Sequence, residues 1–430
     1  MSQLGFTRNE AGALCVDGND LSAIAETYGT PSYVYSLPHI LNQFDMLNAA
    51  VTAHVPPEKA PLLCYACKAN SHTAILRALK NRGSGLEIVS GGELRRGLKA
   101  GFDPAKIVFT GVGKQAHEIR AALEAGIGQF NVESIEELSH ISREAADMDK
   151  QARLVFRVNP DIAGGGHHKI STGRARDKFG IGMDRIAEAY QTALSLPNLQ
   201  PQGLSFHIGS QVFDVEAFHK TFVKIVGLVK DLREAGFEIT VLDIGGGFPI
   251  RYKDEGKLDL EAYASWVREL IQPLDVKIIM EPGRFLVGNG GGLLTRIVSV
   301  KKTRDGDFLI VDAAMNDLIR PTLYEAYHEV VPVRPVQANE QAVSYTIVGP
   351  ICESGDTFAV GREMPVCKEG DLVLMASAGA YGFCMASNYN TRGLPAEILS
   401  IEGKFSLIRP RQSVEELFGN EYIPDWDALI

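Results

Sequence analysis

Several features that mark other classes of protein are scarce in this sequence. Six cysteines in 430 residues are too few for a disulfide framework. No apolar run approaches the roughly 20 residues of a membrane-spanning helix, and residues 1–8 lack the apolar core of a signal peptide. The net charge of −10 arises from mixed signs, which argues against nucleic acid as the main partner. We therefore expect a cytoplasmic globular protein.

The chain has the length of two domains, since 430 residues exceed one ordinary core. Between residues 60 and 285, short apolar runs alternate with amphipathic segments. The expected strands are 62–66, 86–89, 107–110, 129–132, 153–159, 203–208, 239–244 and 277–281. Among the expected helices are 71–81, 92–100, 115–125 and 134–146. This count and spacing match an α/β fold of the (β/α)8 TIM-barrel type, although a doubly wound sheet has the same local pattern.

The pattern changes after Arg284. Runs rich in β-branched residues recur there without intervening helices, at 293–300, 308–311, 343–348, 372–376 and 398–401. They predict a second, all-β domain of sandwich or barrel-like form, to which segment 31–35 adds a strand. We therefore expect a barrel over residues 37–284 and a β domain made of residues 1–36 and 285–430.

Lys68 follows the apolar run 62–67, which reads as a buried strand. We expect poor solvation there to lower the pKa of the amine and make it a nucleophile toward a carbonyl group. A snorkelling lysine is the alternative. Cys64 and Cys67 spell C-x-x-C, but residues three apart on a strand point to opposite faces and no second such pair completes a zinc site. We interpret both as core cysteines.

Charged and polar residues recur where the expected strands end, which is where barrels of this type build their active sites. They are Glu87, Arg157, His207, Asp243 and Glu281.

A glycine triplet, 245–247, follows the seventh expected strand. Backbone without Cβ atoms can approach an anion closely, and such barrels often bind phosphate at this point. A phosphate site, an amine at Lys68 and a carboxyl group at Glu281 together point to pyridoxal phosphate, whose ring nitrogen needs an acidic partner. His207 is placed to stack on its ring.

Two other motifs favour different ligands. Residues 111–116 fit G-x-G-x-x-A, and Glu133 follows about 20 residues later, as in a dinucleotide site. Because this motif follows the third strand and not the first of a βαβ unit, we interpret it as an ordinary barrel turn. His167 and His168 lack the spacing of a helical metal site, and no metal is expected.

Further motifs extend nearly from end to end of the chain. They are 65–70, 89–94, 170–173, 178–181, 206–210, 245–247, 281–284, 320–324, 349–356, 379–381 and 388–390. Together they closely resemble those of the diaminopimelate decarboxylases, which belong to the fold-type III family of pyridoxal-phosphate enzymes. Glu87 stands where Asp is expected in that family.

The resemblance implies a role for each matching residue. Lys68 would hold the cofactor through a Schiff base, and Lys68, Cys352, His207 and Glu281 would be catalytic, with Cys352 as the proton donor. Further cofactor contacts would come from His207, Ser210, Gly245, Gly246, Gly247, Glu281, Pro282, Gly283, Arg284 and Tyr381. Substrate contacts would come from Arg284, Arg320, Tyr324, Glu353 and Tyr381. The family works as a homodimer with shared active sites, which Cys352 and Glu353 would enter from the neighbouring subunit.

The implied reaction converts meso-2,6-diaminopimelate to L-lysine and CO2, the last step of lysine synthesis. Arg284, Arg320 and Tyr324 suit a distal carboxylate, and Glu353 suits a distal ammonium group. An alternative is a paralogue that acts on another amino acid with a distal carboxylate, such as carrier-tethered glutamate, although Glu353 favours the first reading. A non-catalytic binding protein is a further alternative, but such a relative is expected to have lost Lys68 or Cys352.

Overall fold

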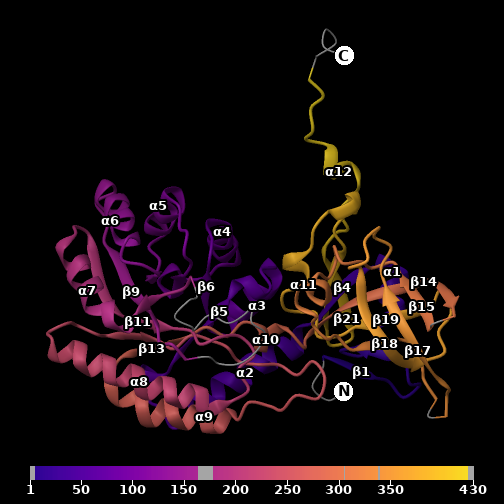
Figure 1. Ribbon diagram of the computed structural model, residues 1–430, viewed down its shortest axis with the longest axis horizontal. Coiled ribbons are helices and arrows are strands. Elements are labelled where there is room, and N and C mark those ends of the chain that lie inside the picture. The colour runs from indigo at the N-terminus through magenta and orange to yellow at the C-terminus, as the bar shows by residue number, and fades with distance from the viewer. Residues whose placement is uncertain (1–4, 163–177, 305, 338, 425–430) are drawn as a thin grey trace. The chain divides into compact units, whose positions relative to one another are not determined.

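The computed structural model describes residues 5–162, 178–304, 306–337 and 339–424 (Figure 1). The chain divides into two compact units. One is continuous and covers His39–Gly288, whereas the other combines Met1–Pro38 with Asn289–Ile430. We refer to them as the barrel unit and the β unit.

Parallel strands form a closed ring in the barrel unit. In order around the ring they are β5 (Leu62–Ala66), β6 (Gly85–Ile88), β7 (Ile107–Phe109), β8 (Gln129–Val132), β9 (Ala152–Asn159), β11 (Leu199–Phe206), β12 (Val241–Asp243) and β13 (Lys277–Met280). The pairing of β13 with β5 closes the ring, and β10 (Ile181–Gly182) pairs with β9 outside it. The predicted (β/α)8 barrel is confirmed, and the doubly wound alternative is excluded because that sheet is open.

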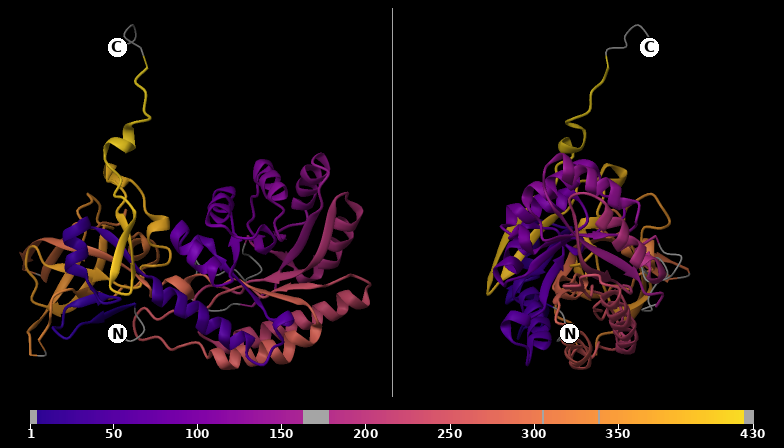
Figure 2. Two further views of the ribbon diagram at one scale, coloured as in Figure 1. Left: turned by 180° about the vertical axis from the view of Figure 1, so that it is seen from behind. Right: turned by 90° about the vertical axis from the view of Figure 1, so that its left-hand side faces the viewer.

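Helices surround these strands in both views of Figure 2. They are α2 (Leu37–Thr52), α3 (Thr73–Asn81), α4 (Gly91–Ala100), α5 (Ala116–Ala125), α6 (Glu137–Asp147), α7 (Ile186–Ser195), α8 (Val215–Glu234), α9 (Leu260–Trp266) and the short α10 (Arg284–Val287). Their ends follow from local chemistry: the Ser90 side chain caps α4, and Gly101 ends it in the left-handed conformation. The helix expected at 134–146 begins three residues later, because Ser134 accepts a hydrogen bond from the Glu137 N–H in the turn before it.

The barrel interior contains a cluster of small and β-branched side chains. Its members are Cys64, Val108, Val155, Val241 and Ile279. Branched residues from several strands fill the centre of such barrels, so the barrel is a packed core and not a pore. Cys64 and Cys67 are fully buried and unpaired, which confirms both as core cysteines. Burial raises the pKa of each thiol, so both stay protonated and unreactive.

The β unit is built around one extended sheet. Its strands, in spatial order, are β18 (Thr357–Pro365), β17 (Ala342–Val348), β15 (Gly306–Val311), β14 (Gly291–Thr303), β4 (Ser32–Ser36), β20 (Ala396–Ile401) and β21 (Lys404–Arg409), with β19 (Leu372–Met375) and β16 (Val330–Pro332) branching from β14. Because β4 lies between β14 and β20, the predicted contribution of the N-terminal segment is confirmed.

Smaller elements complete the β unit. A separate sheet contains β1 (Phe6–Arg8), β2 (Leu14–Val16) and β3 (Asn19–Asp20). Three short helices, α1 (Leu21–Tyr28), α11 (Arg320–Tyr324) and α12 (Glu415–Phe418), show that the unit is predominantly but not exclusively β.

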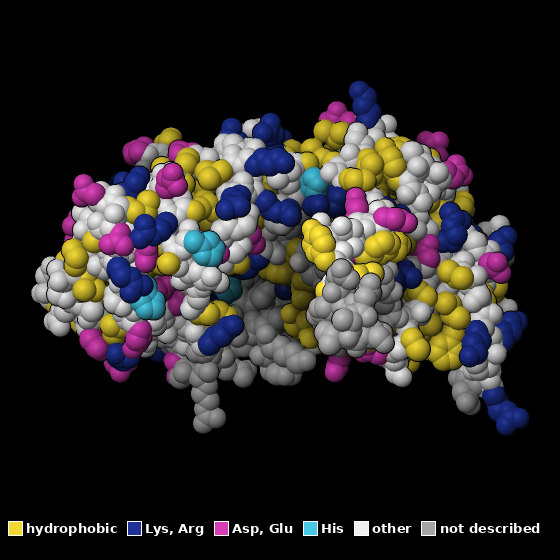
Figure 3. All heavy atoms as spheres, turned by 90° about the horizontal axis from the view of Figure 1, so that it is seen from above, with side chains coloured by type: hydrophobic (Ala, Val, Ile, Leu, Met, Phe, Trp, Pro, Cys, Tyr) yellow, Lys and Arg dark blue, Asp and Glu magenta, His cyan; other side chains and the backbone are white. Residues whose placement is uncertain are grey.

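The helices and the surface add two further observations. None of the described helices is both long and apolar enough to cross a membrane. Basic and acidic side chains are intermingled over the described part of the face in Figure 3. This agrees with the mixed charge of the sequence.

Gly203 in β11 provides a test of the ring, because a Cβ atom there would lie 1.9 Å from the carbonyl oxygen of Val241 in β12. We expect Gly203→Ala to force the two strands apart and to lower stability by about 1–3 kcal/mol. Gly227 of α8 is the matched control, since a Cβ atom there meets nothing within 4 Å. Gly227→Ala should stabilise the helix by about 0.5–1 kcal/mol. Thermal unfolding followed by circular dichroism measures both, and an unchanged Tm for Gly203→Ala would contradict the close strand contact.

Candidate active site

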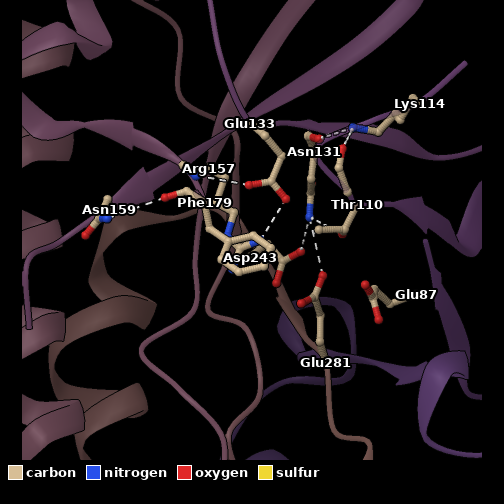
Figure 4. Close-up of polar contacts among 12 residues, drawn as sticks. Glu87, Thr110, Lys114, Asn131, Glu133, Arg157, Asn159, Phe179, Asp243 and Glu281 are labelled. Carbon is tan, nitrogen blue, oxygen red and sulfur yellow. Dashed lines mark hydrogen bonds and ion pairs between the residues drawn. The ribbon is translucent and has the colours of Figure 1, made fainter. Parts of the chain in front are cut away.

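Polar side chains meet at the C-terminal ends of the barrel strands. Lys68 lies on the 3-10 turn after β5, Glu87 on β6, Asn131 on β8 and Asp243 on β12, while Glu281 directly follows β13. Parallel strands place all these ends on one side of the barrel, and Figure 4 shows the carboxyl groups of Asp243 and Glu281 turned toward the Asn131 amide. Five strands therefore each contribute a polar side chain at the end of the barrel where the site is predicted.

The Lys68 amine is held by Glu87. Its Nζ lies 2.7 Å from Glu87 Oε2 and 2.9 Å from Oε1. The Glu87 side chain is fully buried, but the Lys68 side chain is 42% exposed. The expectation of a poorly solvated amine was therefore wrong: the strand ends before Lys68, and the 3-10 turn carries the residue out of the core. A neighbouring carboxylate also favours the charged ammonium, opposite to the expected effect of burial. The longer Glu, where Asp was expected, still reaches the amine with both oxygens.

Two acidic side chains, Asp243 and Glu281, lie beside the same Asn131 amide. Burial raises the pKa of Asp243 to about 6, although hydrogen bonds from Glu281, the Gly245 N–H and Asn131 act in the opposite direction. The pKa of Glu281 lies well above its usual range, mainly because of burial and then because of the charges of Asp243 and Glu87. Both carboxyl groups contact the Asn131 amide, and burial favours the protonated form of each.

Close main-chain contacts shape the glycine segment after β12. A Cβ atom on Gly245 would lie 2.3 Å from the Phe206 oxygen, and one on Gly246 would lie 2.2 Å from the Glu281 oxygen. Gly245 and Gly247 also have positive φ angles of 67° and 97°. The segment therefore requires glycine for its own packing. The Gly245 N–H donates to Asp243 Oδ1, and the Gly246 N–H donates to His207 Nδ1 over 3.3 Å, so two of the predicted phosphate donors already have partners within the protein.

His207 is a neutral imidazole. Burial lowers its pKa to about 3, and the positive charges of Arg157 and Lys68 act in the same direction. Because Nδ1 accepts the Gly246 N–H, the ring hydrogen is assigned to Nε2. A neutral ring can stack on an aromatic cofactor without bringing a charge to it.

Arg284 opens α10 and is buried. Its Nη1 donates to the Tyr252 hydroxyl over 2.7 Å, and its Nη2 donates to Ser210 Oγ over 3.0 Å. Tyr252 was not identified from the sequence, because it lies in a segment without periodicity and nothing local marks its contact with a residue 32 positions away.

The dinucleotide-like motif is an ordinary turn, as predicted. Lys114 within it is almost fully buried and donates to Glu137, to the Gly111 oxygen and to the Asn131 oxygen. Glu133 pairs with Arg157 at 2.7 Å (Figure 4), so its carboxylate stabilises the barrel and is not directed to a ribose.

Two of the sequence motifs lie outside the described residues, namely His167 with His168 and segment 170–173. Within the described ranges, no group of three or more His, Cys, Asp or Glu side chains is arranged to hold a metal ion.

The remaining predicted residues lie in the β unit. Arg320 is buried at the start of α11, donates from Nε to His328 Nε2 over 3.3 Å and lies 5.7 Å from the centre of the Tyr324 ring. His328 Nδ1 lies 2.9 Å from the Ala376 carbonyl oxygen, which can only accept a hydrogen bond. The ring hydrogen is therefore assigned to Nδ1, and Nε2 accepts the hydrogen bond from Arg320. Tyr381 has a positive φ of 55°.

Cys352 and Glu353 are both exposed, on the loop that follows β17. The Cys352 N–H donates to Asn390 Oδ1 over 3.4 Å. Buried Asp356 secures the same loop, since it accepts the Ile351 N–H over 2.7 Å. A hydrogen bond with Glu353 raises the pKa of the Tyr389 hydroxyl.

The structure thus brings together Lys68, His207, Ser210, Gly245–247, Glu281 and Arg284 within the barrel unit. Arg320, Tyr324, Cys352, Glu353 and Tyr381 lie in the β unit. The individual roles assigned to these residues stay predictions.

Comparison with known proteins covers nearly the whole chain. Residues 42–288 match the family described as pyridoxal-dependent decarboxylase, pyridoxal binding domain. Diaminopimelate decarboxylase of Zymomonas mobilis is 43% identical over 417 residues, covering 96% of this chain and 98% of the relative. That of Pseudomonas aeruginosa is 46% identical over 408 residues, covering 95% and 96%.

Solved structures agree with these sequence matches. Helicobacter pylori diaminopimelate decarboxylase complexed with L-lysine has a TM-score of 0.88 and 38% identity, and covers 94% of this chain and 99% of its own. The enzyme of M. jannaschii, in co-complex with L-lysine, has a TM-score of 0.92 and 35% identity, and covers 97% and 98%. With identities this high over nearly full length, the chain belongs to the diaminopimelate decarboxylase family of pyridoxal-dependent decarboxylases.

Proposed function

We propose that this protein decarboxylates meso-2,6-diaminopimelate to L-lysine and CO2, with pyridoxal 5′-phosphate as its cofactor, as the last step of lysine synthesis. Membership of the family supports this reaction. The observation that carries it is the convergence of Lys68 and Glu281 at the ends of the adjacent strands β5 and β13. An amine and a carboxyl group at one barrel mouth are the two groups that this cofactor requires.

The residues at the barrel mouth fit the cofactor in their chemistry. Lys68 Nζ is exposed enough to react with an aldehyde, and Glu281 would face the ring nitrogen. Backbone around Gly245–247 can approach a phosphate, although the Gly246 N–H would have to leave His207 to donate to it. His207 would lie against the ring, and Ser210, Pro282, Gly283 and Tyr381 would complete the contacts. When bound, the cofactor supplies the electron sink for the electron pair left at the α-carbon as CO2 departs.

The substrate carries two amino-acid centres, and the chain offers groups for each. Arg284 and Arg320 present guanidinium groups that can bind carboxylates in bidentate fashion, and Tyr324 adds a hydroxyl group. Glu353 would pair with the distal ammonium group. An enzyme for ornithine, which has a cationic end and no distal carboxylate, would need acidic groups in place of these arginines.

Cys352 would return the proton. After CO2 leaves, a proton must reach the α-carbon, and we assign its delivery to Cys352 Sγ. Cys352 and Glu353 are exposed in the β unit, so they are available to complete a site on a neighbouring subunit. We therefore propose a homodimer with shared active sites, in which residues 37–284 bind the cofactor and residues 1–36 with 285–430 supply Cys352 and Glu353. The structure describes all six cysteines and none forms a disulfide, which suits a reducing cytoplasm.

Product analysis tests the proposed reaction directly. Purified protein with pyridoxal phosphate and meso-diaminopimelate should release CO2 and form L-lysine, whereas glutamate and ornithine should give little or no product. Borohydride reduction followed by peptide mapping should place the cofactor on Lys68, and Lys68→Ala should lose both the label and turnover. Turnover of glutamate but not of diaminopimelate would favour the paralogue that acts on another distal carboxylate, and an unlabelled Lys68 would refute the attachment.

Two exposed cysteines allow a matched test of the proton donor. Cys352→Ala should keep cofactor binding but lower kcat by about 10²–10⁴-fold, because general acid catalysis contributes about that much. Cys384 is also exposed and forms no disulfide, so Cys384→Ala controls for the loss of a surface thiol. Steady-state assays of both variants give the comparison. A wild-type rate for Cys352→Ala would exclude its acid role.

A further inference from the structure

We propose that Asp243 and Glu281 hold one proton between them, and that Asn131 is the positioning residue that orients both carboxyl groups. The pairing is a property of the protein alone. Its use in catalysis rests on the proposed function, in which Glu281 faces the ring nitrogen of the cofactor. Three observations support it: the contacts of the Asn131 amide, the fixed orientation of that amide, and the charges around the pair.

The Asn131 amide faces both acids. Its Nδ2 lies 3.2 Å from Asp243 Oδ2 and 3.3 Å from Glu281 Oε1 (Figure 4). A third acceptor, Thr110 Oγ1, lies 3.1 Å away. An NH2 group has two hydrogens for these three acceptors, so it cannot satisfy all of them at full strength. A proton between the two carboxyl groups removes the conflict, because one acid then donates to the other.

The orientation of this amide is fixed from its other side. Gln129 Nε2 donates to Asn131 Oδ1 over 2.8 Å, which requires the NH2 group to point toward the acids. The main-chain oxygen of Asn131 accepts from Lys114 Nζ over 2.7 Å. Lys114 is itself nearly fully buried and paired with Glu137 at 2.7 Å. The turn that resembled a dinucleotide motif therefore anchors the residue that holds the acid pair.

The surrounding charges favour a single proton. Lys68 after β5 is already paired with Glu87 of β6. Among the described residues, the Cys64 thiol of β5 and the Tyr263 hydroxyl of α9 also lie near the pair, and the pKa of each is raised by burial and by Asp243, so both are neutral. The nearby His207 is neutral as well, because burial lowers its pKa to about 3. If both acids were ionised, three carboxylates, those of Asp243, Glu281 and Glu87, would lie near the single ammonium group of Lys68. One proton on the pair leaves only one negative charge without a compensating positive charge.

The proton resides mainly on Glu281. Asp243 also accepts the Gly245 N–H over 3.0 Å, and hydrogen bonds from N–H groups stabilise a carboxylate. Glu281 would therefore present a protonated oxygen to the ring nitrogen of the bound cofactor.

Infrared spectroscopy of the cofactor-free, full-length protein tests the shared proton. At pH 7 the wild type should show a C=O band of buried carboxylic acids, to which Glu93 also contributes because burial raises its pKa to about 7. The isosteric Glu281→Gln should lose the part of this band that belongs to the acid pair and keep the part from Glu93. In the wild type a second proton should bind to the pair near pH 6, where Asp243 titrates. A C=O band that Glu281→Gln leaves unchanged at pH 7 would overturn the proposal.

Variants of Asn131 test its positioning role. Asn131→Ala removes a donor to the Asp243 carboxylate, so the second protonation should shift upward by about one pH unit, the equivalent of one hydrogen bond. Asn159→Ala is the matched control: this asparagine lies at the C-terminal end of the neighbouring strand β9, and its Nδ2 contacts the Phe179 oxygen (Figure 4). A wild-type titration midpoint in Asn131→Ala, or an equal shift in both variants, would refute the assigned role.

The pH dependence of stability gives a second measurement. A carboxyl group whose pKa is raised on folding keeps its proton in the folded state after the unfolded chain has lost it, so stability falls as pH rises. The Tm of the wild type should therefore decline between about pH 4 and 6, the ordinary and the raised pKa of Asp243, and the decline should be smaller in Asp243→Asn. Equal slopes would contradict the proposal. Since every sample lacks cofactor, these results are independent of whether Lys68 binds it.

Discussion

The parallel pairing of β13 with β5 is the constraint on which the rest of the site depends. It closes the ring and brings the last strand of the barrel beside the first, although more than 200 residues separate them. The Ala66 N–H donates to the Pro282 oxygen over 3.0 Å, so the contact continues beyond the strands themselves. Lys68 lies two residues after the end of β5, and Glu281 is the first residue after β13. A site that needs an amine and an acid side by side therefore obtains both from ring closure.

Charge at the barrel mouth is neutralised in two different ways. Lys68 and Glu87 neutralise each other as an ion pair, and the half-exposed lysine remains accessible. Asp243 and Glu281 are both acids that contact the same Asn131 amide, and burial favours the protonated form of each. The same side of the barrel thus contains an amine that is partly exposed to solvent and two acids whose protonated form burial favours. These are the separate requirements of covalent attachment and of an acidic partner for a ring nitrogen.

The sequence predicted much of this arrangement because many of its signals are local. Alternating apolar runs defined the barrel strands to within a few residues. The glycine triplet was expected to approach an anion, which stays a prediction, and the close contact found at Gly246 is with the Glu281 main-chain oxygen. Contacts between distant strands were not predictable in this way. Asn131 is an ordinary strand residue in the sequence, and its role depends on acids 112 and 150 positions away. The solvation of Lys68 was misjudged for a related reason, since the turn after β5 and not the strand decides its exposure.

Buried acids at the barrel mouth reduce stability, and their presence has a functional explanation. Replacing one of them by an apolar residue would remove the desolvation penalty that raises the pKa of Asp243 and Glu281. The surrounding donors do not remove that penalty; they fix where the acids point, since Gln129 orients Asn131 and Lys114 holds its main chain. Hydrogen bonds that orient two destabilising groups are expected at sites where the geometry of those groups matters more than the stability of the fold. A reaction that depends on one correctly placed proton meets that condition.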